Sequence, residues 1–134
     1  MARGEILVLD NWKDNKYIEK QLKQQLKIEN IYNWNYPKNF KTNEKLIFLL
    51  ENKIILSVLH ITIINNELEF TFSFTPINKR RNGYNKKLRL YIINKYKKIG
   101  INKYTSTPYP GSNSIPLLKS IGFIKIGNQY KQTI

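Results

Sequence analysis

Residues 72–85 read FSFTPINKRRNGYN and pass from an apolar strand through a basic loop toward a helix. Pro76 ends the strand pattern, because proline cannot donate to a sheet ladder. At residues 80–85 three features favour an anion: free backbone N–H groups, the positive end of the helix dipole, and Gly83, which lets the backbone approach a ligand closely. The spacing fits a diphosphate, and it also fits a solvated turn built on Asn82 and Gly83.

Charge is unevenly divided along the chain. The first 69 residues carry ten basic and nine acidic side chains, whereas the remaining 65 carry 13 basic side chains and no acidic one. Isoleucine, lysine, asparagine and tyrosine use A- and T-rich codons and are abundant here, so composition explains part of the net charge of +14. Such a bias acts on both halves alike. The asymmetry therefore predicts an anionic partner for the second half.

The length of 134 residues predicts one domain, residues 1–134, with enough buried surface for a core. Because there is no cysteine, disulfides, thiolate nucleophiles and zinc knuckles are excluded. The chain starts without a long apolar segment, and its longest apolar run, residues 54–64, is shorter than the roughly 20 residues that span a bilayer. We therefore expect a soluble, cytoplasmic protein with no membrane partner.

The N-terminal part predicts a strand followed by a helix. Residues 5–9 are short and apolar, which suits a first strand. A helix is expected over residues 12–29 with Asn11 as its cap and Asp14 in its first turn. Its buried face would carry three apolar side chains at helical spacing, Ile18, Leu22 and Leu26.

The middle of the chain predicts a β meander. Residues 31–43 are rich in aromatic side chains and asparagine without a clear period, which indicates a packed loop or short helix, or alternatively an acceptor-binding rim. Residues 45–75 contain three runs dense in isoleucine, leucine, valine and phenylalanine. Asn52 and Asn65 mark the turns between them, because asparagine tolerates positive φ. Three antiparallel strands are therefore expected.

The C-terminal part predicts two helices and two strands. A helix over residues 85–99 would end at Gly100. One of its faces carries Leu88, Tyr91, Ile92, Lys95 and Ile99, an apolar stripe broken by a single lysine. A strand is expected over residues 103–107, followed by a short helix with Pro116 in its first turn and a last strand from Phe123.

Few kinds of catalytic chemistry are compatible with this composition. The single histidine, His60, lies within an apolar strand, where a packed core histidine is expected. With no cysteine and one histidine, catalytic triads, Cys–His pairs and most transition-metal sites cannot form. The carboxylates show no hard-cation spacing, and the glycines form neither a P-loop nor a dinucleotide fingerprint. We expect no metal and a reaction that depends on a bound cofactor.

Three short motifs occur in order along the chain. Residues 72–76 have the pattern hydrophobic-x-hydrophobic-x-Pro, and residues 80–85 read Arg-Arg-Asn-Gly-Tyr-Asn at the start of a helix. A closing pattern, small-x-x-Leu-hydrophobic-x-x-x-Gly-Phe, is formed by Ser114, Leu117, Leu118, Gly122 and Phe123. In this order, between a β meander and a terminal strand, the motifs resemble those of the GNAT superfamily of acetyl-CoA-dependent acyltransferases, and the likeness covers most of the chain.

The resemblance implies an α+β fold, an α/β/α sandwich. In it a GNAT-like mixed, mainly antiparallel twisted sheet of six to seven strands is flanked by three to four helices. It also implies that acetyl-CoA is the acyl donor, with its pantetheine arm on the strand and its diphosphate on the loop. The cofactor-binding residues that it assigns are Phe72, Ser73, Phe74, Arg80, Arg81, Asn82, Gly83, Tyr84, Asn85 and Asn113.

The chain departs from the family pattern near its C-terminus. Leu118 stands where many members place a tyrosine that protonates the departing thiolate. Tyr109 is the replacement that we assign, with Tyr104 or the absence of any acid as alternatives. The family's asparagine before the last helix is replaced by Gly111, and Asn113 follows two residues later.

The resemblance further implies direct transfer of an acetyl group to a primary amine. An amine with a pKa of about 10 is mostly protonated at neutral pH, so direct transfer needs a base, often acting through water. Glu69, on the strand that leads to the loop, is the candidate, and Glu67 lies two residues away on the same face. Either could instead be an exposed strand carboxylate without a catalytic role. The backbone amide of Phe74 could polarise the thioester carbonyl.

Two other functions remain open. A nucleic-acid-binding module would contact phosphates through a basic helix that carries Lys86, Lys87, Arg89, Lys95, Lys97 and Lys98. A catalytically degenerate relative would bind coenzyme A, or a protein partner, without transferring a group. For an acetyltransferase the acceptor, whether a small molecule, a protein or an RNA-borne amine, is undecided by the sequence, as is the oligomeric state.

Overall fold

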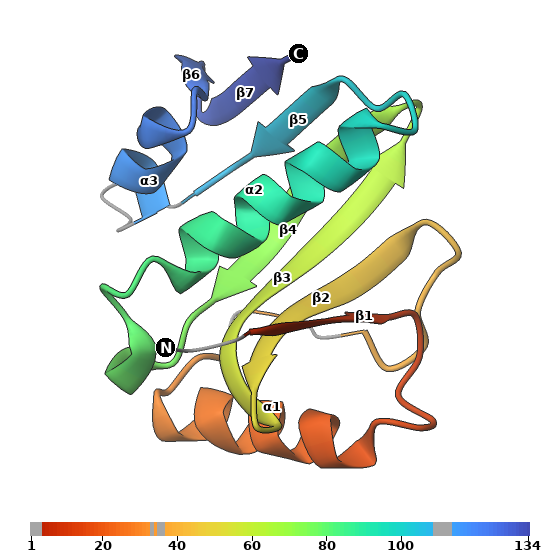
Figure 1. Ribbon diagram of the computed structural model, residues 1–134, viewed down its shortest axis with the longest axis vertical. Helices are drawn as coiled ribbons and strands as arrows, with labels where there is room; N and C mark the ends of the chain where they lie inside the picture. The colour runs from red at the N-terminus through yellow and green to blue at the C-terminus, as the bar shows by residue number, and fades with distance from the viewer. Residues whose placement is uncertain (1–3, 33, 35–36, 109–113) are drawn as a thin grey trace.

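The computed structural model describes residues 4–32, 34, 37–108 and 114–134, which form a seven-stranded sheet in the order β1-β2-β3-β4-β5-β7-β6 (Figure 1). The strands are β1 (Glu5–Leu9), β2 (Glu44–Glu51), β3 (Ile54–Ile64), β4 (Glu67–Phe74), β5 (Lys103–Ser106), β6 (Ile124–Ile126) and β7 (Gln129–Thr133). The helices are α1 (Lys16–Ile28), α2 (Tyr84–Lys97) and α3 (Ser114–Ser120), with a 3-10 turn, η1, at Ile77–Lys79. This mixed, mainly antiparallel sheet confirms the predicted fold class.

Paired left-handed residues set the register of the meander. The β2–β3 turn has φ of 50° at Asn52 and 65° at Lys53, and the β3–β4 turn has 52° at Asn65 and 61° at Asn66. Two consecutive residues with positive φ give a hairpin whose twist matches that of the strands, and asparagine adopts this conformation easily. The predicted three antiparallel strands are confirmed.

β4 and β5 run parallel, because α2 carries the chain from one end of the sheet back to the other. Their pairing covers only part of β4, from Glu67 opposite Lys103 to Phe70 opposite Ser106. β4 continues to Phe74, whereas β5 ends at Ser106. On its β5 side, the end of β4 therefore has no strand partner among the described residues.

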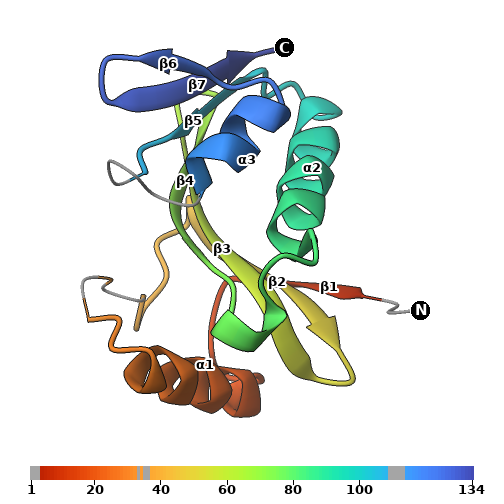
Figure 2. The ribbon, with the colours of Figure 1, turned by 90° about the vertical axis from the view of Figure 1, so that its left-hand side faces the viewer.

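Different helices cover the two faces of the sheet, as Figure 2 shows. α1 packs on one face, where its apolar side chains join those of β2 and β3, including Ile18, Leu22, Leu26, Phe48 and Val58. α2 and α3 pack on the other face with Leu59, Ile61, Leu68, Leu88, Ile92 and Leu118. Each strand of the meander thus contributes alternate side chains to two cores, which fixes its register against both helices.

α1 begins four residues later than predicted, at Lys16 rather than at Trp12. Trp12 is buried instead in the core below the sheet, with an exposed fraction of 4%, and its indole Nε1 donates to Pro37 O at 2.6 Å. The backbone of Asn15 then closes a turn by donating to Trp12 O at 2.9 Å. Asn11 Oδ1 accepts from Lys13 N and so shapes this turn rather than capping the helix.

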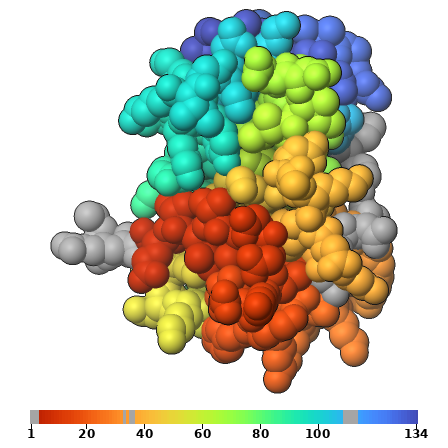
Figure 3. Space-filling model, turned by 90° about the vertical axis from the view of Figure 1, so that its right-hand side faces the viewer, coloured from red at the N-terminus to blue at the C-terminus, as the bar shows by residue number. Residues whose placement is uncertain are grey.

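α2 confirms the second predicted helix, but the predicted buried stripe is wrong. The buried side chains are Leu88, Arg89, Ile92, Ile93 and Tyr96, whereas Tyr91, Lys95 and Ile99 are exposed. Arg89 is therefore not part of the basic outer surface expected for nucleic-acid contact. In Figure 3 the outer face of α2, green to cyan, lies on the surface, where its exposed lysines are Lys86, Lys87, Lys95 and Lys97.

The last predicted strand is a hairpin of two strands, β6 and β7, which turns at Gly127 with φ of 64°.

In the described part of residues 31–43 no helix occurs; Trp34 and Phe40 pack against the α1 core, which agrees with a packed loop. A search of the described residues finds no helix whose length and hydropathy would let it cross a bilayer.

Candidate functional site

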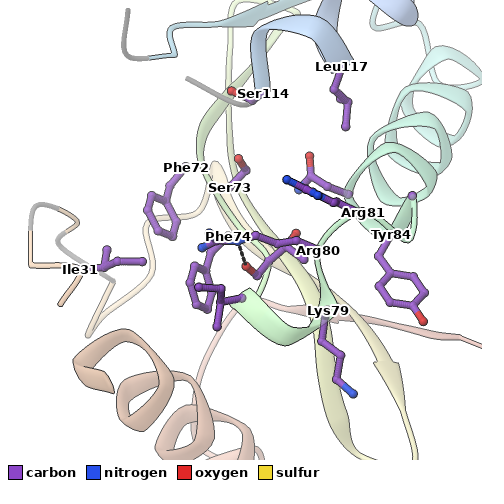
Figure 4. A pocket seen from close by; sticks show the side chains of 14 residues that line it. Ile31, Phe72, Ser73, Phe74, Lys79, Arg80, Arg81, Tyr84, Ser114 and Leu117 are labelled. Carbon is purple, nitrogen blue, oxygen red and sulfur yellow. Dashed lines mark hydrogen bonds between the residues drawn. The ribbon is translucent and has the colours of Figure 1, made fainter. Parts of the chain in front are cut away.

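A cavity of about 1010 Å³ opens where β4 extends beyond the end of β5. Figure 4 shows Phe72 and Ser73 of β4 on one side, Leu117 of α3 above, and Arg81 and Tyr84 on the other side. The cavity is lined by Ile31, Phe72, Ser73, Phe74, Thr75, Ile77, Lys79, Arg80, Arg81, Gly83, Tyr84, Asn85, Ser114 and Leu117. The predicted strand motif and the predicted loop therefore meet at one site.

The loop between β4 and α2 is held in shape by its own side chains. Arg80 Nε donates to Thr75 O at 3.0 Å, the dashed line in Figure 4. Asn82 Nδ2 donates to Lys79 O at 3.0 Å and to Arg80 O at 3.2 Å. These two side chains, predicted to contact the cofactor, use these donors to shape the loop, and Asn82 is not among the residues that line the cavity.

Glu29, just past the end of α1, ties this loop to the helix. Its carboxylate accepts from Arg80 Nη2 at 2.8 Å, from Ile77 N at 3.0 Å and from Gln25 Nε2 at 2.7 Å. Only 8% of the Glu29 side chain is accessible, so these are shielded, charge-assisted hydrogen bonds. The sequence could not predict this attachment of the loop to α1, because Glu29 and Ile77 lie 48 positions apart. We call Glu29 the anchor of the loop.

Two left-handed residues turn the backbone into α2. Arg81 has φ of 66° and Gly83 has φ of 75°. The helical ladder starts with Lys87 N donating to Gly83 O at 2.9 Å, so the preceding N–H groups of the first turn have no acceptor within the helix. Lys79 and Arg81 line the adjoining cavity, and none of the described lining residues is acidic. The arrangement suits an oxyanion such as a diphosphate.

Asn85, on the cavity wall, belongs to a buried polar chain. Its Nδ2 donates to Ser57 Oγ at 3.1 Å, and its Oδ1 accepts from Arg89 Nε at 2.8 Å. Ser57 Oγ is hydrogen-bonded in turn to Thr75 Oγ1 at 2.9 Å. This chain joins α2 to β3 and to the end of β4, and its buried members, Ser57 and Arg89, were not predicted as site residues.

The remaining predicted residues have different outcomes. Phe72, Ser73 and Phe74 line the cavity, and their contact with a cofactor stays a prediction. Tyr109 and Asn113, predicted as the acid and as a cofactor residue, lie outside the described residues. Leu118, at the position where the resemblance expects a tyrosine, is fully buried in the core, and its aliphatic side chain has no proton to donate.

Glu69, the predicted base, is exposed on β4 opposite Thr62 of β3 and Thr105 of β5. It lies three positions before Phe72 and does not line the cavity. Glu67, on the same face, accepts a hydrogen bond from Thr105 Oγ1 at 3.1 Å. The role of Glu69 as a base therefore stays a prediction.

A second cluster adjoins the cavity at Phe72. The Trp34 ring stacks on Phe72 with 4.1 Å between centroids and an interplanar angle of 3°. Trp34 Nε1 donates to His60 Nδ1 at 3.2 Å, so Nδ1 carries no proton and the other ring nitrogen donates to Glu44 Oε2 at 2.9 Å. His60 is buried, as predicted for a core histidine, and its carboxylate partner was not foreseen.

Glu44 should make the stability of the fold depend on pH. Burial raises the pKa of the Glu44 carboxyl, but hydrogen bonds from Lys41 N and His60, together with the electrostatic attraction of these two residues, outweigh burial and hold the pKa below its usual 4.5. Because the folded-state pKa is lowered, the carboxylate stabilises the fold fully above about pH 4.5, and this contribution is lost as the pH falls through the lowered value. Glu44→Gln should therefore lower the free energy of unfolding at pH 7 by about 1–2 kcal/mol and flatten the decline in acid.

Urea unfolding at a series of pH values measures this effect, and Glu51→Gln, on the same strand, is the control. Parallel pH profiles for the wild type and Glu44→Gln would contradict the assignment.

Comparisons with known proteins find matches by structure only. No family model and no curated protein sequence matches the chain. The YhhK protein of Escherichia coli, solved bound to coenzyme A, matches with a TM-score of 0.75 at 15% identity, covering 98% of this chain and 99% of that one. The ribosomal-protein-S18-alanine N-acetyltransferase of E. coli matches with a TM-score of 0.72 at 12% identity, covering 96% and 90%.

A third similar structure is the PaiA N-acetyltransferase of Thermoplasma acidophilum in complex with coenzyme A. It has a TM-score of 0.67 and 15% identity, and the match covers 97% of this chain and 99% of that one. These three matches span nearly the whole of both chains. The chain therefore has the fold of the GNAT acetyltransferases.

Proposed function

We propose that this chain is an N-acetyltransferase that takes the acetyl group of acetyl-CoA and transfers it directly to a primary amine. The observation that carries the proposal is the cavity between the free end of β4 and the basic loop before α2. Two structures of the same fold were solved with coenzyme A, which supports the choice of donor.

The residues present fit a coenzyme A thioester. The end of β4, Phe72 to Phe74, offers backbone groups on its unpaired side to the amides of the pantetheine arm, as an added strand would use them. The first turn of α2 with Lys79 and Arg81 would hold the diphosphate. The cavity is large enough for this arm, since drug-sized ligand sites usually measure about 300–1,000 Å³.

In the proposed reaction the amine nitrogen attacks the thioester carbonyl, so that a C–N bond forms and the C–S bond breaks. The amine proton passes through water to Glu69, and the leaving sulfur departs as thiolate or takes a proton from solvent. The backbone amide of Phe74 would stabilise the negative charge that develops on the carbonyl oxygen.

Thermal unfolding with acetyl-CoA tests the proposal. A ligand at 100 times its Kd stabilises a protein by about 2.7 kcal/mol, so the unfolding temperature should rise by several degrees. Formation of free thiol in the presence of an amine acceptor would then report transfer. If millimolar acetyl-CoA leaves the unfolding temperature unchanged, the proposed function is wrong.

Glu69→Gln should reduce acetyl transfer by about 100-fold or more without changing the affinity for acetyl-CoA, because a general base typically contributes about 10²–10⁴ in rate. The loss should concern kcat at neutral pH and shrink at higher pH, where the free amine is more abundant. Glu67→Gln, two residues away on the same strand face, is the matched control and should keep its activity. A Glu69→Gln rate equal to that of the wild type would remove Glu69 as the base.

A further inference from the structure

Arg89 is a cation buried on the inner side of α2, with an exposed fraction of 1%. Its Nε donates to Asn85 Oδ1 at 2.8 Å, and its guanidinium carbon lies 4.9 Å from the centre of the Phe70 ring. Its Nη1 is buried and has no hydrogen-bond partner. Burial lowers the pKa of Arg89 to about 10, which leaves the side chain charged at neutral pH.

This charge has no carboxylate partner among the described residues. The sequence itself contains no acidic residue after Glu69. Glu69 is next to Phe70 in β4, but it is exposed on the opposite face of the sheet. Burying a charge without an opposite charge nearby costs free energy. Because the chain supplies no carboxylate, an anion that reduces this cost for Arg89 has to come from a ligand.

The position of the guanidinium indicates where that anion would bind. A helical side chain points toward the helix N-terminus, and Arg89 contacts Asn85 one turn earlier. Asn85 lines the cavity, and Phe70 is the last residue of β4 paired with β5. The charge therefore lies directly behind the cavity wall, where β4 and β5 part. In this interior the dielectric constant is low, so a positive charge attracts an anion in the cavity more strongly than a surface lysine does.

We propose that Arg89 is the counter-charge of an anionic group on the ligand that fills this cavity, and that the free protein carries this cation uncompensated. The proposal rests on the proposed function in taking that ligand to be a coenzyme A thioester. The oxyanion has two possible sources on such a ligand: the phosphates of the coenzyme and a carboxylate at the end of the acyl group.

Arg89→Met tests this, because methionine keeps much of the apolar stem and removes the charge. Calorimetric titration with coenzyme A, acetyl-CoA and succinyl-CoA separates the two sources. If Arg89→Met raises the Kd at least tenfold for all three ligands, the partner of Arg89 is a phosphate of the coenzyme. If the Kd rises only for succinyl-CoA, the partner is the carboxylate of the acyl group. Unchanged affinities for all three would overturn the proposal. Lys95→Met, the same change of charge at an exposed position of α2, is the matched control and should bind like the wild type.

The unfolding temperature of the ligand-free protein is a second measurement, because a structural role and an uncompensated charge predict changes in opposite directions. Removing a core residue of purely structural role lowers the unfolding temperature, whereas removing an uncompensated buried charge leaves it unchanged or raises it. Asn85→Asp keeps Arg89 and places a carboxylate beside its Nε, so it should raise the unfolding temperature of the free protein. A lower unfolding temperature in Asn85→Asp would count against an uncompensated charge.

The two proposals fail in different ways. If the wild type binds none of coenzyme A, acetyl-CoA and succinyl-CoA, the proposed function is wrong. The unfolding temperatures of the ligand-free variants would still show whether the charge of Arg89 is uncompensated. A wild type that binds them with the same affinity as Arg89→Met would overturn only the role of Arg89.

Discussion

Replacing Gly83 by valine should remove most of the stabilisation that acetyl-CoA gives to this protein. Gly83 stands in the left-handed region with φ of 75°, immediately before the first turn of α2. A Cβ placed there meets no atom within 4 Å, so the free protein loses only the conformational strain of about 1–2 kcal/mol. A bound diphosphate, however, would need that open space, because the backbone N–H groups reach an anion only at close approach.

Differential scanning fluorimetry with acetyl-CoA measures the effect. The wild type should gain about 2.7 kcal/mol at 100 times its Kd, and Gly83→Val should gain less than about 1 kcal/mol at the same concentration. Gly127→Val is the matched control: Gly127 also has positive φ, 64°, with no atom within 4 Å of an added Cβ, but it lies in the β6–β7 turn. Equal ligand-induced shifts in both variants would show that the anion does not bind at the loop.

Glu29→Ala should lower both the stability of the fold and the affinity for acetyl-CoA, although Glu29 does not line the cavity. It would remove the acceptor of Arg80 Nη2, of Ile77 N and of Gln25 Nε2, and the first two of these donors belong to the loop that leads to α2. A hydrogen bond to a charged group contributes about 1.5–3 kcal/mol, but the Arg80 side chain is 42% accessible and its bond to Glu29 counts for little. The free energy of unfolding should therefore fall by about 2 kcal/mol, mainly through loss of the bond from Ile77 N. Loss of this anchor should also weaken acetyl-CoA binding by about tenfold, since the loop would have to be ordered by the ligand.

Urea unfolding and calorimetric titration test the two parts separately. Glu19→Ala in α1 is the control, because Glu19 forms only ion pairs at 3.5 Å with exposed lysines of the same helix. Such pairs contribute at most about 0.5 kcal/mol, so Glu19→Ala should change neither quantity noticeably. Unchanged acetyl-CoA affinity in Glu29→Ala would mean that the loop is ordered without its anchor.

The loop also shows what a motif can and cannot reveal. The pattern at residues 80–85 predicted the turn into α2, where the structure has it, and all of these residues except Asn82 also line the cavity. It could not show that Arg80, Asn82 and Asn85 direct their side chains to the protein, because their partners lie elsewhere in the chain. For these residues a role in holding the loop is now supported by contacts, while direct contact with a cofactor stays a prediction.

α2 gives the opposite lesson, since helical periodicity misplaced its buried face. The hydrophobic pattern predicts a buried stripe through Tyr91, Lys95 and Ile99, with Arg89 among the basic side chains available for nucleic-acid contact. In the structure Arg89 and Tyr96 are buried, and Tyr91 and Ile99 are exposed. Arg89 is buried with Asn85 Oδ1, one turn earlier in the helix, as the acceptor for its Nε.

The sequence by itself determined the order of strands and helices, the asparagine turns, and the separation of acidic from purely basic halves at Glu69. These features depend on neighbours in the chain: hydrophobic period, turn residues and local charge. Three features were decided by the tertiary structure alone. β4 extends beyond the end of β5, Glu29 holds the loop before α2, and the charged side chain of Arg89 is buried behind the cavity wall. These depend on contacts between residues far apart in the chain, whose energies no local pattern records.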